Sequence, residues 1–109
     1  MRERLEIPPG TLYMLILKTL QRSPLHGYAI VRWLHDQTKD ALQVEEGSLY
    51  PALQRMLIKG WVTAEWGQSE TGRKVRFYRL THAGRKQLGA EVSDFDRVVK
   101  AIYKVIEPA

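Results

Sequence analysis

The sequence predicts a mainly α-helical domain with a small β-hairpin, and three observations lead to this fold class. Residues 47–60 form a short segment that carries both the start and the stop signals of a helix. Directly after this segment, the spacing of apolar residues changes from the helical period to the alternation of a β-strand. The end of the chain then places apolar residues at heptad spacing, which predicts one long helix.

The composition is that of a folded chain with a mild excess of positive charge. The 109 residues suit one small domain, and the formal net charge is +5. This charge permits nucleic acid or an anionic membrane surface as a partner and demands neither. No apolar run approaches the roughly 20 residues needed to span a bilayer, so no membrane-spanning segment is expected. The expected partner is nucleic acid and not a membrane. The absence of cysteine excludes disulfides and thiolate metal sites and fits a cytoplasmic protein.

Two helices are expected before residue 47. An N-terminal arm, residues 1–9, ends in two prolines, and the apolar stripe that follows predicts a helix over about 11–21. After a break that contains Pro24, a second helix is expected over about 26–38, with Tyr28 in the core and its hydroxyl at the edge. Residues 41–44 form a short link with some strand character.

The helix within residues 47–60 is expected to display a polar and basic face. Proline has no N–H, so Pro51 should lie in the first turn, which makes Ser48 the N-cap. Gly60 suits the left-handed position after the last turn. At about 100° per residue, one side is apolar. The other side holds Ser48, Pro51, Gln54, Arg55, Ile58 and Lys59, with Tyr50 at the border.

A basic hairpin follows. Residues 61–66 and 75–80 read as strands, joined by a polar tip over 67–74. By parity, Trp61 and Trp66 should lie on opposite faces of their strand, with one in the core and the other nearer the surface. Cations gather on the tip and the second strand without any acidic residue between them: Arg73, Lys74, Arg76 and Arg79.

Thr81 can cap a final helix that runs to about Glu107. Its apolar residues repeat at alternating intervals of four and three, which is an a/d heptad seam. Such a helix either folds back across the domain or pairs with another subunit, and the strict spacing favours pairing. We therefore divide the chain into a domain over 1–81, which includes the arm, and a dimerisation helix over 82–109. The predicted dimer interface is Leu88, Val92, Phe95, Val99, Ile102 and Ile106.

This order of elements predicts a winged helix-turn-helix followed by a dimerisation helix. A helix fits the major groove of double-stranded DNA, a basic hairpin beside it can hold phosphates, and a homodimer would read a near-palindrome. One rival interpretation is a winged-helix module that binds protein and does not read DNA. Another is an RNA reader, which is less favoured because single-strand readers expose aromatic platforms and the aromatics here are mostly at core spacing.

The chain also resembles the PadR-like transcriptional regulators. The resemblance extends from about Gly10 to Ile106, with the motifs in the family's order. These motifs are residues 26–30, 47–56, 60–62 and 78–81, with Gly84 and Leu88.

The resemblance implies a dimeric repressor that a small molecule or another cue releases from DNA. It implies that Ser48, Tyr50 and Pro51 open the recognition helix, and that Arg73, Lys74 and Arg76 lie on the wing. The compact branch of the family includes members whose ligands bind between subunits against aromatic residues, and Phe95 is the matching candidate; ordinary packing is the alternative. The complete predicted DNA-binding set is Ser48, Tyr50, Pro51, Gln54, Arg55, Arg73, Lys74 and Arg76.

The sequence predicts no catalytic, metal-binding or cofactor-binding residues. His26 and His35 would lie on opposite faces of one helix, and His82 stands alone at a helix start, so the histidines are expected to be structural or solvated. No glycine loop that cradles phosphate and no supported Ser/His/Asp set is present. We therefore do not expect an enzyme.

Overall fold

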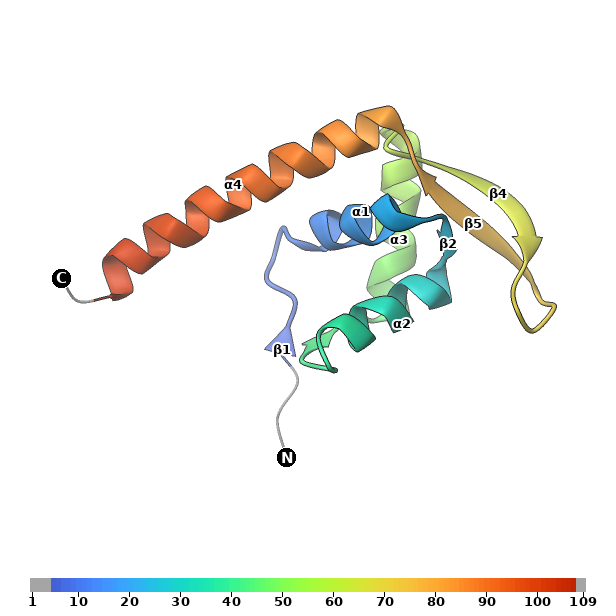
Figure 1. The fold of residues 1–109 in the computed structure, drawn as a ribbon, viewed down its shortest axis with the longest axis horizontal. Helices are drawn as coiled ribbons and strands as arrows, with labels where there is room; N and C mark the ends of the chain where they lie inside the picture. Colours follow the sequence, from blue (N-terminus) through green and yellow to red (C-terminus); the bar gives the residue numbers. More distant parts are fainter. Residues whose placement is uncertain (1–4, 108–109) are drawn as a thin grey trace.

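The computed structural model describes residues 5–107, which fold into four helices and short strands (Figure 1). The predicted fold class, mainly α with a small β-hairpin and a long C-terminal helix, is confirmed. In chain order the elements are β1 (Leu5–Glu6), α1 (Leu12–Arg22), β2 (Leu25–His26), α2 (Gly27–Gln37), β3 (Leu42–Gln43), α3 (Glu46–Ile58), β4 (Val62–Gln68), β5 (Lys74–Leu80) and α4 (His82–Ile106).

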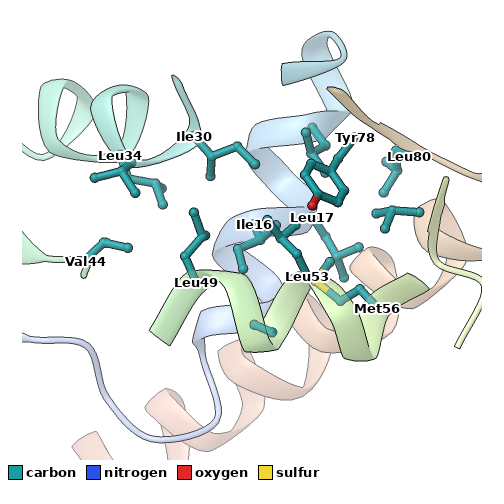
Figure 2. Close-up of a cluster of buried hydrophobic side chains, with 14 of the residues drawn as sticks. Ile16, Leu17, Ile30, Leu34, Val44, Leu49, Leu53, Met56, Tyr78 and Leu80 are labelled. Atoms are coloured by element: carbon teal, nitrogen blue, oxygen red, sulfur yellow. The ribbon is translucent and has the colours of Figure 1, made fainter. Parts of the chain in front are cut away.

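The core forms where α1, α2 and α3 pack against one another and against the β4–β5 hairpin. Each helix buries apolar residues at intervals of three and four, as an amphipathic helix must to shield one face from water. Full burial of a leucine or isoleucine side chain stabilises a fold by about 1.5–3 kcal/mol. Figure 2 shows the cluster, in which the labelled side chains are Ile16, Leu17, Ile30, Leu34, Val44, Leu49, Leu53, Met56, Tyr78 and Leu80.

The hairpin of β4 and β5, which we call the wing, is longer than the sequence predicted. The antiparallel pairing continues to Gln68 opposite Lys74, so part of the expected tip belongs to the strands. The turn closes when the Ser69 N–H donates to the Arg73 carbonyl (2.9 Å) and the Gly72 N–H donates to the Ser69 carbonyl (2.9 Å). Gly72 has a φ of +82°, a conformation that glycine adopts without strain. β2 pairs with the other edge of β5.

The N-terminal arm is more ordered than expected. Residues 5–6 form β1, which pairs in parallel with β3, and residues 1–4 of the expected arm lie outside the described residues. This pairing brings the start of the described chain beside the link that leads into α3.

The start of α3 corrects the prediction. The helix begins at Glu46 with Glu45 as its N-cap, so Ser48 is not the cap and Pro51 lies inside the helix. The Ser48 and Leu49 N–H groups both donate to the Glu45 carbonyl (3.1 and 3.0 Å). A contact from another helix accounts for the earlier start: the Val44 N–H donates to His35 Nε2 (3.2 Å), and this bond fixes the chain just before the first turn.

α4 begins as predicted and then leaves the domain. The Gly84 N–H donates to Thr81 Oγ1 (3.0 Å), which confirms the predicted cap. Only Gly84 and Leu88 of this helix are buried, against the end of the wing and α1. The rest of α4 extends away from the domain on the side opposite the wing (Figure 1). Within residues 5–107, no helix is both long enough and apolar enough to span a bilayer.

Candidate nucleic-acid interface

The outer face of α3 carries the polar groups that the sequence predicted there. The helix buries Leu49, Leu53 and Met56 against the core, so the positions between them point outward. All five residues predicted on this face for DNA contact are exposed: Ser48, Tyr50, Pro51, Gln54 and Arg55. Hydroxyl, amide and guanidinium groups of this kind match the hydrogen-bonding edges of bases and the phosphate oxygens.

Tyr50 is held against the first turn of α2. A Cβ atom at Gly27 would lie 2.6 Å from the Tyr50 hydroxyl oxygen, so any larger residue there would displace this ring. Partial burial, together with the nearby Glu46 carboxylate, raises the pKa of Tyr50. The hydroxyl therefore stays protonated at neutral pH and can donate a hydrogen bond.

The wing presents cations without acidic partners. Arg73 and Lys74 are exposed at its tip, and Arg76 is half-buried on β5. Among residues 5–107 the one ion pair joins Arg97 and Asp94 on α4 (3.5 Å), far along the chain from the wing. The positive charge of the wing is therefore available to an anionic partner.

The predicted DNA-binding residues fall into two groups in the structure, one on α3 and one on the wing. Ser48, Tyr50 and Pro51 lie in the N-terminal half of α3, whereas Arg55 lies in its last turn, about 6 Å beyond Pro51 and about 10 Å beyond Ser48 along the axis at 1.5 Å per residue. The three wing cations lie on the separate β4–β5 hairpin (Figure 1). A partner that contacts both groups must therefore be an extended one.

Two glutamates border the exposed face of α3. Glu45 accepts a hydrogen bond from the Gln43 side chain (3.1 Å), and Glu46 lies in the first turn of the helix. Carboxylates stabilise the positive end of the helix dipole but repel phosphate. Both are exposed, so they limit the approach of an anionic partner at this end of the helix.

Two aromatic side chains, Tyr28 and Trp66, are exposed in the structure, and the sequence had placed one of them in the core. Tyr28 is not in the core as expected, because it is 53% exposed, and the Arg32 guanidinium lies 5.9 Å from its ring centroid one helical turn along. Trp66 is 62% exposed on the wing, while Trp61 is half-buried against Tyr13, as strand parity predicted for one of the two. The expectation that Tyr28 lies in the core is therefore wrong, whereas the exposure of Trp66 agrees with strand parity. Two exposed rings weaken the case against an RNA reader, which rested on aromatics at core spacing.

The residues predicted for the dimer interface divide between core and surface. Leu88 is buried inside the domain itself. Val99 is half-buried, and four more present apolar side chains on the exposed part of α4: Val92, Phe95, Ile102 and Ile106.

Two cavities of the described residues lie away from Phe95. A cavity of about 340 Å³ lies between residues 6–10 and the start of α3, and one of about 150 Å³ lies beside Phe77 and Arg79. Among residues 5–107, no group of three His, Asp or Glu side chains is arranged to hold a metal ion.

Comparisons with known proteins identify the family. Residues 16–90, more than half of the chain, match the transcriptional regulator PadR-like family. The chain belongs to this family. A curated relative from Lysinibacillus sphaericus, described as uncharacterized protein X, is 29% identical over 104 residues, which is 95% of each chain. The PadR-like resemblance inferred from the sequence motifs is thereby confirmed.

Solved structures share the PadR-like fold. A transcriptional regulator from Clostridium thermocellum has a TM-score of 0.83 and 26% identity, over 90% of this chain and 95% of its own. Bacillus subtilis PadR in complex with operator DNA has a TM-score of 0.67 and 23% identity, over 75% of this chain and 47% of its own. The PadR-like family is one of transcriptional regulators, and this chain is a member.

Proposed function

We propose that this PadR-like regulator binds a near-palindromic DNA operator as a homodimer and acts as a repressor. One observation carries the proposal: the exposed polar face of α3 and the unpaired cations of the wing belong to one domain with a shared core. In this arrangement the N-terminal half of α3 enters the major groove, and the wing holds phosphates on the flanking DNA.

The two parts of the interface have different tasks. Ser48, Tyr50, Pro51 and Gln54 contact base edges or the groove wall, because they lie on the outer face of the helix. Arg73, Lys74 and Arg76 contact phosphates, and Arg55 does so from the end of α3. Each neutralised phosphate releases counterions, so binding should weaken steeply with salt.

The free part of α4 supplies the dimer. Its exposed apolar residues repeat at heptad spacing, and burial against a second copy removes them from water. Such a dimer carries two α3 helices, so the operator should contain two half-sites about 10 base pairs apart or a multiple of that distance. Release by a small molecule that binds near Phe95, or by another cue, completes the proposed regulatory cycle.

Selection from a pool of random duplex DNA tests this function. The purified full chain is incubated with the pool, bound duplexes are sequenced, and affinity for the enriched site is measured between about 50 and 200 mM salt. Enrichment of a palindrome with a steep salt dependence supports the proposal. Failure of a folded protein to enrich any duplex contradicts it and favours a module that binds protein.

A further inference from the structure

The wing carries an exposed tryptophan whose ring lies close to two cations. Trp66 stands directly opposite Arg76 in the β4–β5 register, and Lys74 follows one step along the same face, opposite Gln68. Side chains at positions i and i+2 of a strand share a face, so Trp66, Lys74 and Arg76 form one cluster. The Lys74 Nζ lies 5.0 Å from the Trp66 ring centroid, and the Arg76 Cζ lies 5.7 Å from it.

Ring contacts hold Arg76 in the described structure. Its Cζ lies 5.9 Å from the centroid of Tyr78, the next residue on the same face, so the guanidinium lies near two aromatic rings, one across the hairpin and one along β5. Within residues 5–107 its Nε is shielded from solvent and has no hydrogen-bond partner, and no carboxylate pairs with the side chain. Hydrogen bonds and ion pairs therefore do not account for its position, whereas attraction of the cation to the aromatic faces does.

Core packing does not account for Trp66. Tyr78 and Leu80 on the same face of the hairpin are buried, but the face leaves the core as it continues toward the tip, and Trp66 is 62% exposed. A large exposed aromatic on a hairpin is open to water on its outer side. The cationic groups near its ring are those of Lys74 and Arg76, so a role for Trp66 through these two side chains follows from the geometry.

We propose that Trp66 is a positioning residue of the wing, which orients Lys74 and Arg76 for contact with consecutive DNA phosphates. The inference rests on the proposed function and adds a residue to it. Long cationic side chains lose rotamer freedom when they bind a phosphate, and a side chain restrained beforehand loses less. Trp66 thus strengthens binding without carrying charge itself.

The salt dependence of DNA binding distinguishes the proposed positioning role of Trp66 from the charge that Lys74 contributes. Removal of Lys74 takes away one phosphate contact per subunit, so Lys74→Ala should reduce the slope of log K against log[salt] by about 2 for a dimer. Trp66→Ala leaves every charge in place. It should weaken binding about tenfold at every salt concentration while the slope stays unchanged.

A substitution series tests the role of the ring face. Titrations use a fluorescent duplex of the selected sequence with full-length Trp66→Phe, Trp66→Leu and Trp66→Ala. Phe keeps an aromatic face and should retain most of the affinity, whereas Leu keeps apolar bulk without that face and should lose as much as Ala. Because Trp66 is exposed, all three variants should melt near the wild-type temperature, which confirms that the fold is intact.

A third experiment removes Trp66 from a protein that already lacks both cations. If Trp66 acts through the two cations, Trp66→Ala should have no further effect in a protein that already carries Lys74→Ala and Arg76→Ala. If Trp66→Ala weakens binding fully in the protein that lacks both cations, Trp66 contacts DNA directly. If Trp66→Ala or Trp66→Leu alone binds DNA with wild-type affinity, the aromatic ring of Trp66 has no role in binding. Either result overturns the proposal. Failure of the wild type to bind any duplex would instead contradict the proposed function, so the two failures are distinguishable.

Discussion

Gly84 is the residue on which the junction between the domain and α4 depends. A Cβ atom at this position would lie 2.1 Å from the Trp61 carbonyl oxygen, which is backbone and cannot rotate away. The same carbonyl accepts a hydrogen bond from the Thr81 N–H (3.0 Å), and the Thr81 hydroxyl donates to the Gly60 carbonyl (2.7 Å). The helix can therefore start only if its first turn lies directly on the chain between α3 and β4.

We expect Gly84→Ala to lower the free energy of unfolding by about 2 kcal/mol or more, because overpacking forces the backbone to move. Gly89 is the matched control on the same helix, since a Cβ there meets nothing within 4 Å. Gly89→Ala should raise stability by about 0.5–1 kcal/mol through helix propensity. Urea unfolding followed by circular dichroism measures both, and equal stabilities of the two variants would contradict the close contact at Gly84.

At the scale of the element, α3 depends on a bond from another helix. Val44 is buried just before the N-cap, and its N–H donates to His35 Nε2 on α2. The side chain of the N-cap, Glu45, makes no capping hydrogen bond, so the helix start lacks the usual local support. His35 thus links α2 to the end of α3 that the proposed function places against DNA.

Loss of that link should affect both stability and DNA binding. His35→Ala leaves the Val44 N–H without its partner, and we expect the free energy of unfolding to fall by about 1–3 kcal/mol. Fraying of the first turn of α3 should also weaken operator binding. His82→Ala, at an exposed position, is the control and should change stability by less than about 0.5 kcal/mol. Thermal melting and DNA titration provide the readouts; a fully stable His35→Ala protein would show that the bond does not fix the helix start.

The same element shows what the sequence could predict. Apolar spacing located all four helices and both wing strands, since amphipathic periods depend only on neighbouring residues. It also placed Gln54 and Arg55 on the exposed face of α3. The start of α3 was misplaced because the proline rule is local, whereas the His35–Val44 bond joins residues nine positions apart. The Trp66 cluster was missed for a similar reason, since it exists only in one register of β4 on β5.

At the scale of the whole molecule, the free end of α4 lies apart from the wing. The described chain measures 55 × 38 × 21 Å, and the free end of α4 and the tip of the wing extend in different directions from the helical core (Figure 1). A surface for self-association on α4 would therefore leave the wing and the outer face of α3 uncovered. This arrangement suits the proposed dimer, in which both proposed DNA-contacting surfaces remain accessible at the same time.

The apolar seam of α4 is the surface on which we expect the proposed dimer to form. Phe95 is 39% exposed in the single chain, and Val92, Ile102 and Ile106 lie on the same side of the helix. We expect Phe95→Asp to dissociate the proposed homodimer, because pairing would bury a carboxylate among apolar side chains. The domain itself should stay folded, since Leu88 is the last residue of α4 in its core.

Lys104→Asp is the matched control, because it introduces the same carboxylate on the opposite face of the same helix at 100° per residue. Analytical ultracentrifugation should give a dimer for the wild type and for Lys104→Asp, and a monomer for Phe95→Asp. The melting temperature of the wild type should rise with protein concentration, and that of the Phe95→Asp monomer should not, because only association depends on concentration. A dimeric Phe95→Asp protein would place the interface elsewhere. A monomeric variant that binds the operator as tightly as the wild type would separate DNA recognition from dimerisation, since a single domain could then supply the whole affinity.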